Sequence, residues 1–334
     1  INLEKQFVRT NDGMISYDFL VIALGVKTSY FGKEDEWAKF APGLKTLDQA
    51  MEMRRNVLQA FEDAEAKDDR SQVKQLLTIV VIGGGPTGVE LAGSFAELAK
   101  RVVADDFRRI NTAETEVILI EGGERLLPMY PEELSDYTKK RLEKMGVTVK
   151  LGTNVSEIGD DFVTLGKEKI EAANIIWAAG VKAPKLTETL GVDLDRAGRI
   201  KVEANLTLPE HPNVFAIGDI ASVMGEDGKP VPGLCPAAMQ MGKHVARSLI
   251  SESSEPFRYF DKGSMATIGR KAAVVQFGSG KFTGFFAWLM WLFVHLLFLI
   301  GFRNKVAVFW QWVYSYCTFR RGARIITGVK TDDG

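Results

Sequence analysis

The sequence is poor in the residues that build covalent or metal-bound sites. It contains two cysteines, Cys235 and Cys317, and three histidines. The cysteines lie far apart and form no Cys-x-x-Cys pair, which argues against a disulfide framework and against a cysteine redox relay. The histidines lack the spacing of a metal site, so no metal is predicted.

An excess of one charge is also missing. Forty-two basic and 43 acidic residues leave a formal net charge of −1. This balance gives no electrostatic reason to expect nucleic acid as a partner. The composition, 46% hydrophobic and 25% charged, is ordinary for a globular protein of about two domains. Because the chain opens at Ile1 rather than a methionine, we expect residues to precede it.

One glycine-rich stretch stands out among these ordinary features. The β-branched run Thr78–Ile82 predicts a buried parallel strand. Gly83, Gly85 and Gly88 follow with G-x-G-x-x-G spacing and lead into a helix predicted over 87–105. The first glycine allows a tight turn, the second lets backbone approach a pyrophosphate, and the third lets helix and strand pack closely. This stretch predicts a dinucleotide site.

A second short strand, Glu116-Val-Ile-Leu-Ile-Glu121, ends in an acid. In dinucleotide folds an acid at this place hydrogen-bonds the adenosine ribose and repels a 2′-phosphate. Glu121 therefore favours NADH over NADPH, although Arg125 nearby keeps NADPH open. The acid is further from the glycines than the usual 20 or so residues, which requires a long intervening helix. The alternative for Glu121 is a solvated acid at a strand end.

Other apolar runs also end in glycine or small residues. The segments that follow such strands include Gly25, the pair Ala179 and Gly180, and the pair Gly218 and Asp219. Small residues after a strand leave room for a ligand, but a plain tight turn has the same pattern. Three- and four-residue spacing of apolar side chains predicts further helices over 47–69, 131–144 and 237–250.

The C-terminal part contains an apolar run that is free of formal charge from Phe282 to Phe302. About 20 apolar residues are enough to cross a bilayer, and tryptophans are typical of its interface. Arg303 and Lys305 follow at once, and more arginines follow the next aromatic stretch at positions 320, 321 and 324. Three structures fit this pattern: one membrane span, a helix pair lying on one leaflet, or a buried core helix. We expect membrane contact.

Four motifs occur together in a fixed order. They are Leu20-Val-Ile-Ala-Leu-Gly25, the glycine turn with Glu90, Trp177-Ala-Ala-Gly180 and Phe215-Ala-Ile-Gly-Asp219. With them the chain resembles the FAD-dependent pyridine nucleotide-disulfide reductase superfamily, whose members have two dinucleotide-binding domains. More narrowly, it is similar to the type II NADH:quinone oxidoreductases, which are single-subunit, non-proton-pumping NADH dehydrogenases.

The resemblance implies an α/β fold with two Rossmann-like domains, the NAD domain inserted in the FAD domain, and a C-terminal membrane-associated helical segment. The implied ranges are 1–46 for the first part of the FAD domain, 47–183 for the NAD(H) domain, 184–265 for the second FAD part, and 266–334 for the membrane-anchoring and quinone-site region. The family's first glycine fingerprint would lie upstream of Ile1.

The resemblance also implies cofactors, FAD and NADH, and the residues that contact them. The implied cofactor-binding positions are Gly25, Gly83, Gly85, Gly88, Glu121, Ala179, Gly180, Gly218, Asp219 and Ala238. Glu90 would lie near the nicotinamide, Gln240 at the mouth of the quinone pocket, and Lys305 near the pyrimidine edge of the flavin. These three are the implied catalytic residues.

Each of the three has a simpler alternative. Glu90 could serve the positive end of its helix, Gln240 could be an ordinary polar residue, and Lys305 could be a cation at a membrane boundary. The sequence also departs from the family before Gln240, where Cys235-Pro236 replaces an expected Ala-Gln pair. That departure puts the quinone-site geometry in question.

The implied activity is hydride transfer from NADH to FAD and passage of two electrons to a membrane quinone, ubiquinone or menaquinone, without proton pumping. The missing cysteine pair argues against a disulfide acceptor. The implied location is peripheral, on the cytoplasmic face of a bacterial inner membrane; a homodimer is left open. The alternatives are a sulfide:quinone-type reductase, a redox-sensing NADH- and flavin-binding membrane-associated protein with little turnover, or an inactive remnant.

Overall fold

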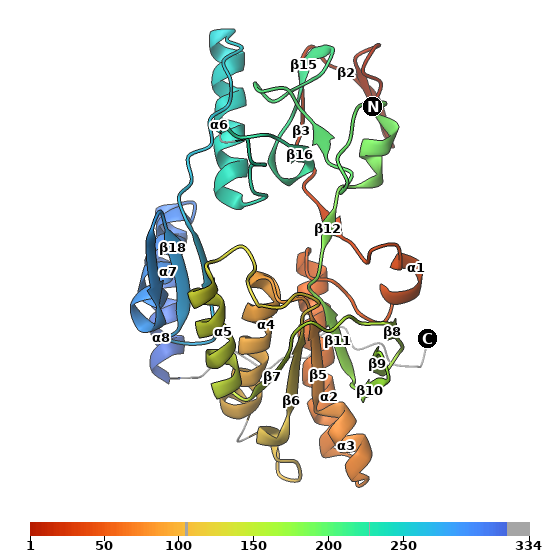
Figure 1. Cartoon of the computed structure of the whole chain (residues 1–334), viewed down its shortest axis with the longest axis vertical. Helices are drawn as coiled ribbons and strands as arrows, with labels where there is room; N and C mark the ends of the chain where they lie inside the picture. Colours follow the sequence, from red (N-terminus) through yellow and green to blue (C-terminus); the bar gives the residue numbers. More distant parts are fainter. Residues whose placement is uncertain (104–105, 227, 319–334) are drawn as a thin grey trace. The chain divides into compact units, whose positions relative to one another are not determined.

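The computed structural model describes residues 1–103, 106–226 and 228–318. The chain forms two compact units, shown in Figure 1. Unit 1 combines residues 1–29 with 181–262, and unit 2 combines residues 30–180 with the chain from 263 onward. The predicted domain ranges, with boundaries after residues 46, 183 and 265, stay predictions.

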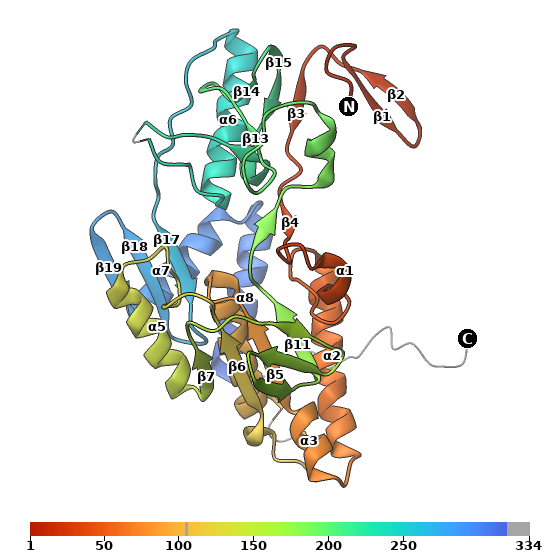
Figure 2. The ribbon, with the colours of Figure 1, turned by 45° about the vertical axis from the view of Figure 1, so that its right-hand side comes forward.

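A four-stranded parallel sheet is the centre of unit 2. Its order is β11-β5-β6-β7, which Figure 2 shows side by side. The strands are β11 (Asn174–Trp177), β5 (Thr78–Ile82), β6 (Glu116–Ile120) and β7 (Val147–Lys150). Every residue of β5 is buried, because a parallel sheet is covered on both faces. The predicted strand at 78–82 is confirmed.

Helices cover one face of this sheet. They are α2 (Leu47–Glu65), α3 (Arg70–Leu76), α4 (Pro86–Glu97) and α5 (Glu132–Lys144), with a π-helical turn at Leu98–Val102 and a 3-10 turn at Thr112–Glu114. A capping box between Thr46 and Gln49 starts α2. Helix α3 was not predicted, because its sequence is mostly polar and lacks the apolar spacing of an amphipathic helix. Asp69 is its N-cap. The predicted end of the α4 segment, residue 105, lies outside the described residues.

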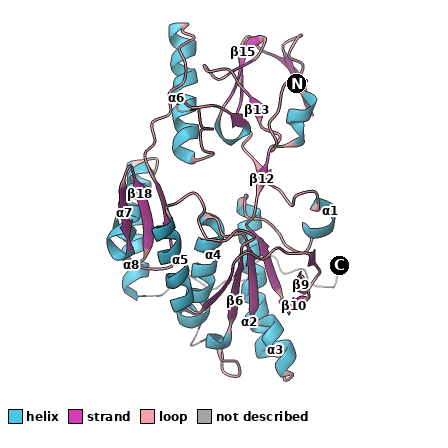
Figure 3. Cartoon of the chain, in the orientation of Figure 1, coloured by secondary structure: helices cyan, strands magenta, loops and turns pink. Residues whose placement is uncertain are grey.

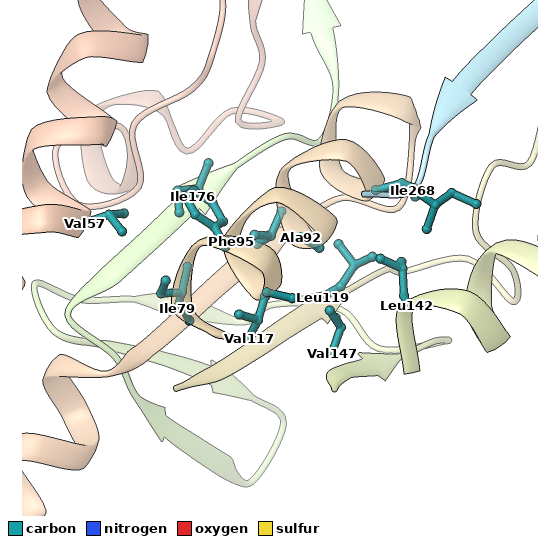
Figure 4. Close-up of a cluster of buried hydrophobic side chains, with 14 of the residues drawn as sticks. Val57, Ile79, Ala92, Phe95, Val117, Leu119, Leu142, Val147, Ile176 and Ile268 are labelled. Carbon is teal, nitrogen blue, oxygen red and sulfur yellow. The ribbon is translucent and has the colours of Figure 1, made fainter. Parts of the chain in front are cut away.

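The main core lies between the sheet and these helices. Figure 4 shows Ile79 and Val117 of the strands beside Ala92 and Phe95 of α4. Leu119 is fully buried in the same cluster. Burying one such large side chain contributes about 1.5–3 kcal/mol to folding. The side chains of β5 and β6 that point to this face therefore stabilise the packing of α4 against the sheet.

The other face carries a loop and a small antiparallel sheet. Tyr30 and Trp37 pack there against Trp177, with ring centroids 5.2 Å and 5.5 Å away. This packing explains why the loop from residue 30 belongs to unit 2. The elements on this face are α1 (Glu34–Trp37), β8 (Glu157–Ile158), β9 (Phe162–Leu165) and β10 (Glu168–Glu171).

The C-terminal part of unit 2 is an antiparallel sheet with two helices, visible in Figure 3. Its elements are β17 (Ser264–Thr267), β18 (Ala273–Phe277), β19 (Gly280–Thr283), α7 (Gly284–Phe298) and α8 (Phe302–Thr318). Ala287 and Trp288 pack α7 onto β18. The uncharged run therefore forms a helix pair with a break at 299–301, not one helix.

Of the three predicted structures for the apolar run, the single span is wrong. Among the described residues, no helix combines the length and the apolar character needed to cross a membrane. A fully buried core helix is also wrong, because Phe286 and Phe293 are exposed. The arginines at positions 320, 321 and 324, which follow the second aromatic stretch, lie outside the described residues.

Unit 1 joins two distant chain segments through parallel strands. Strand β3 (Leu20–Ile22) pairs with β15 (His211–Ala216), which also pairs with β14 (Thr207–Leu208). An N-terminal hairpin pairs β1 (Phe7–Thr10) with β2 (Gly13–Ser16). The other elements are β4 (Lys27–Thr28), β12 (Val181–Lys182), β13 (Ile200–Lys201), β16 (Ala221–Ser222), α6 (Cys235–Ser251) and 3-10 turns at Lys185–Thr189 and Gly218–Ile220.

Candidate functional site

The glycine turn after β5 is crowded at its first and third glycines. Gly83 has φ +116°, and a Cβ on it would lie 2.7 Å from the backbone of Ala178. A Cβ on Gly88 would lie 1.8 Å from the Gly83 carbonyl oxygen. The first therefore allows the turn and the third allows α4 to pack on it, for the physical reasons expected from the sequence.

The second glycine has a different surrounding. A Cβ on Gly85 would meet nothing within 4 Å. Gly85 is the N-cap of α4, and Pro86 follows in the first turn. The N-terminus of α4 is thus open to a close-approaching group, and the helix dipole with its free N–H groups favours a phosphate there.

Glu121 is tied directly to the glycine turn. One carboxylate oxygen accepts the Gly84 N–H at 2.5 Å, and the other accepts the Gly123 N–H at 2.6 Å. A Cβ on Gly84 would lie 2.9 Å from the Glu121 Cβ, so Gly84 is also required for this approach. The strand-end acid therefore shapes the turn through charge-assisted bonds, a role that sequence spacing did not reveal. Its ribose contact stays a prediction.

These residues line one cavity of about 550 Å³. The predicted residues that it brings together are Gly83, Gly85, Glu121, Ala179 and Gly180. Its volume lies in the range of small-molecule sites, and its phosphate-accepting turn beside a strand-end acid fits the chemistry of a dinucleotide. Gly88 lies behind the turn, where it contributes packing rather than a wall.

The cavity also has an aromatic lining, most of which the sequence did not predict. It contains Tyr30, Phe31, Trp37 and Trp177. The loop that carries the first three has no regular apolar spacing, so periodicity could not find it. The Tyr-Phe-Gly triplet ending at Gly32, which has φ +93°, was the one available signal of a constrained turn.

Glu90 lies on α4 and faces the C-terminal sheet. Its Oε1 accepts the Thr267 N–H at 3.2 Å and the Thr267 hydroxyl at 3.4 Å. Burial raises the pKa of Glu90, while the Thr267 bonds and His295 oppose that rise. Burial, with Glu90 adding a smaller effect, also raises the pKa of Tyr130. Glu90 lies beyond the first turn of α4, so the helix-dipole alternative is weak.

In unit 1, predicted FAD positions follow the carboxyl ends of paired parallel strands. Gly25 follows β3 with φ +62°, and Gly218 follows β15 with φ +73°. A Cβ on Gly218 would lie 3.4 Å from the Ala238 Cβ, and one on Gly233 would lie 3.4 Å from an Asp219 carboxylate oxygen. Ligands in open α/β sheets bind beyond strand carboxyl ends. Small residues and an acid at this edge fit a nucleotide cofactor.

Gln240 and Lys305 both have partners other than those expected. The Gln240 amide donates to the Phe260 carbonyl at 2.9 Å and accepts the Phe260 N–H at 3.0 Å. Lys305 donates to the Leu297 carbonyl at 2.8 Å, at the end of α7. Gln240 thus joins α6 to the segment that follows it, and Lys305 donates to an α7 carbonyl group. Their catalytic roles stay predictions.

The described residues were also compared with the ligand sets of metal sites. In the part of the chain that the structure describes, no three His, Cys, Asp or Glu side chains gather as a metal-binding group. Cys235 is a free, exposed thiol at the start of α6.

Comparison with known families and solved structures shows the class of protein to which this fold belongs. A sequence model of the pyridine nucleotide-disulphide oxidoreductases matches residues 2–242, and one of the NDH2 C-terminal domain matches residues 262–321. The solved structure of NDH2 from Plasmodium falciparum in complex with NADH shares the fold, with a TM-score of 0.87 at 19% identity, over 96% of this chain and 83% of that chain. Both findings indicate a two-dinucleotide-domain flavoprotein fold.

Curated relatives narrow the class. Two type II NADH:quinone oxidoreductases of Mycobacterium tuberculosis, Ndh and NdhA, are 42% and 43% identical to this chain. Each match covers 93% of this chain and 69% of the relative. The chain belongs to the type II NADH:quinone oxidoreductase family.

Proposed function

We propose that this chain passes a hydride from NADH to FAD and two electrons onward to a membrane quinone, without pumping protons. The observation that carries the proposal is the cavity of the glycine turn and Glu121, in a chain of this family. When bound, FAD supplies the hydride acceptor and the two-electron carrier. The protein's part is to bind, orient and protonate.

NADH binding is assigned to the cavity in unit 2. The open α4 N-terminus at Gly85 accepts the pyrophosphate. Glu121 holds the turn and presents its remaining acceptor capacity to the adenosine ribose. Ala179 and Gly180 leave room beside β11. This arrangement favours NADH, because a 2′-phosphate would meet the Glu121 carboxylate.

FAD binding is assigned to the strand ends in unit 1. Gly25, Gly218 and Ala238 leave room for the cofactor, and Asp219 offers a carboxylate to its hydroxyl groups. The 334 residues of the sequence hold no neighbouring cysteine pair. A quinone is the acceptor that matches this chemistry and family.

Proton handling is assigned to Glu90 in unit 2, with Gln240 of unit 1 positioning the quinone. Burial keeps Glu90 protonated to a higher pH than an exposed glutamate, which suits a group that gives a proton to a reduced quinone. Gln240 would have to exchange its Phe260 bonds for a quinone oxygen. Lys305 supplies positive charge for reduced flavin.

Membrane association is assigned to the exposed face of α7 and α8. Large apolar side chains recur there at helical spacing, and α7 contains no acidic or basic residue except His295. The exposed members are Phe285, Phe286, Leu289, Phe293, Leu297, Phe298, Ile300, Phe302, Val306, Phe309, Trp310, Val313 and Tyr314. Exposed large apolar side chains on a helix pair are typical of helices lying in one leaflet. We assign it to the cytoplasmic face of a bacterial inner membrane; a homodimer stays a prediction.

The activity is tested with FAD-loaded protein in lipid vesicles. Adding NADH should give rapid, quinone-dependent oxidation with ubiquinone or menaquinone analogues. The comparison of the two analogues identifies the quinone class. No stimulation by either, with ferricyanide reduction intact, would contradict the quinone proposal and favour a sensor with little turnover.

The membrane face is tested by vesicle flotation. Phe286→Glu and Phe293→Glu together should reduce the vesicle-bound fraction about tenfold or more, because a buried charge opposes insertion. Met129→Glu is the matched control, since Met129 is exposed in the same unit but lies outside α7 and α8. Equal flotation of both variants would place the anchor elsewhere.

A further inference from the structure

Phe31 has an unusual backbone for a bulky residue. Its φ is +54°, in the left-handed region that large side chains rarely adopt. Gly32, with φ +93°, continues the turn. Strained non-glycine residues of this kind persist where the surroundings over-determine them, and they cluster at ligand sites. The strained backbone at Phe31 must therefore be held by neighbouring residues, and the position of its ring is a candidate ligand contact.

Tyr30 holds the turn. Its hydroxyl donates to the Ala41 carbonyl at 2.8 Å, and its carbonyl accepts the Lys33 N–H at 3.1 Å. Its ring packs on Trp177 and is 5% exposed, whereas the neighbouring Phe31 ring is 72% exposed. Burying Tyr30 thus forces the next side chain outward, over the cavity.

The Phe31 ring lies at the β11 end of the cavity. It meets Trp177 edge-on, with centroids 6.1 Å apart at 63°. It also lies over Gly180, where a Cβ would come 2.7 Å from the tip of the Phe31 ring. Gly180 itself has φ +79°, a backbone conformation that favours glycine. The result is an apolar, solvent-facing ring on a wall of the dinucleotide cavity.

The sheet order tells which half of the dinucleotide this ring meets. Glu121 follows β6, the glycine turn follows β5, and Gly180 follows β11, with β5 between the other two. A pyrophosphate at the glycine turn and an adenosine ribose at Glu121 direct the rest of the molecule toward β11. We propose that Phe31 contacts the nicotinamide half of NADH and contributes to its binding. This inference rests on the proposed NADH site.

The test measures binding to FAD-loaded protein whose flavin has been reduced anaerobically, so that bound NADH cannot react. Titration calorimetry compares NADH, reduced nicotinamide mononucleotide and ADP-ribose. Phe31→Gly relieves the backbone strain and removes the ring. It should weaken NADH and the mononucleotide about three- to tenfold, the size of one aromatic contact, and leave ADP-ribose unchanged. Phe31→Tyr should restore binding, because it restores the ring.

Two further variants separate the halves of the site. Glu121→Ala removes the proposed ribose contact as well as the hydrogen bonds to the turn, so it should weaken ADP-ribose more than the mononucleotide. Phe277→Leu, an exposed phenylalanine of unit 2 outside the cavity, should bind all three ligands normally. The unfolding midpoint of Phe31→Gly should not fall, because its ring is exposed.

The nicotinamide assignment is overturned if Phe31→Gly leaves NADH binding unchanged, or if it weakens ADP-ribose as much as the mononucleotide. These outcomes are independent of the quinone assay. If the protein does not reduce quinone, but Phe31→Gly still weakens NADH and the mononucleotide without weakening ADP-ribose, the proposed function is contradicted. The contact between Phe31 and the nicotinamide half is then still supported.

Discussion

Two glutamates near the glycine turn have opposite surroundings. The Glu121 carboxylate accepts two backbone N–H groups at 2.5 Å and 2.6 Å. Glu90 is largely buried, and its carboxyl group accepts hydrogen bonds from the backbone and the hydroxyl of Thr267. The same residue type thus serves as a charged brace for a turn in one place and as a carboxyl with a raised pKa in the other.

Replacing Glu90 by glutamine should stabilise the folded protein at neutral pH. Burial raises the pKa of Glu90 in the folded state. Folding is therefore favoured by this group at pH below its unfolded value of about 4.3, and that contribution is lost as pH rises through the raised folded value. Glu90→Gln removes the loss, so it should gain on the order of 1 kcal/mol at pH 7 and nothing at pH 4.

Urea unfolding of the FAD-loaded protein between pH 4 and pH 8 measures this difference. Glu124→Gln is the control, because Glu124 is exposed beside the same turn. A gain for Glu90→Gln that is the same at pH 4 and pH 7 would show that Glu90 does not titrate in this range.

Among the elements, Arg270 links three parts of unit 2. It lies in the turn between β17 and β18 and is 8% exposed. Its side chain forms an ion pair with Glu97 of α4 at 3.5 Å and donates to the Ser315 carbonyl of α8 at 3.0 Å. Its guanidinium lies 5.4 Å from the Tyr316 ring. One buried cation thus fastens α8 and the C-terminal sheet to α4.

Arg270→Ala should destabilise unit 2 by about 3–5 kcal/mol, because the Glu97 carboxylate keeps the backbone N–H of residue 270 but loses its cationic partner. Adding Glu97→Gln should recover part of that loss. Denaturant unfolding measures both, with Lys150→Ala as the control, since the Lys150–Glu168 pair is more exposed and such pairs contribute about 0–1 kcal/mol. If the double variant is as unstable as the single, the ion pair is not the cause.

At the scale of the whole molecule, each unit carries one of the two proposed nucleotide-binding edges. Unit 1 is assembled from residues 1–29 and 181–262, and unit 2 carries the glycine turn. The residues assigned to FAD and those assigned to NADH therefore belong to separate cores. Lesions in one edge should leave binding at the other intact.

Asp219→Ala tests this separation. It should lower the flavin content of the purified protein and weaken FAD binding about tenfold, because a charged hydrogen bond contributes about 1.5–3 kcal/mol. ADP-ribose binding in unit 2 should stay unchanged. Flavin absorbance and calorimetry measure the two, with the exposed Asp193→Ala as control. Loss of ADP-ribose binding with normal flavin content would contradict the assignment.

The sequence by itself predicted the strand and the glycine turn of unit 2, because these features depend on local chemistry. The strand Thr78–Ile82 and the crowding at Gly83 and Gly88 follow from β-branched side chains and from contacts only glycine permits. The position of Glu121 at a strand end follows from the same pattern. These features depend on residues near one another in the chain, so spacing was enough to predict them.

Tertiary structure decided what depends on distant residues. Tyr30 and Phe31 reach the cavity because they pack on Trp177, and Glu90 is buried because Thr267 covers it. The apolar run forms a helix pair whose buried side chains, among them Trp288, pack with the C-terminal sheet. Burial and partners across the chain are set by packing, which periodicity does not encode, so only the folded structure shows the aromatic wall and the environment of Glu90.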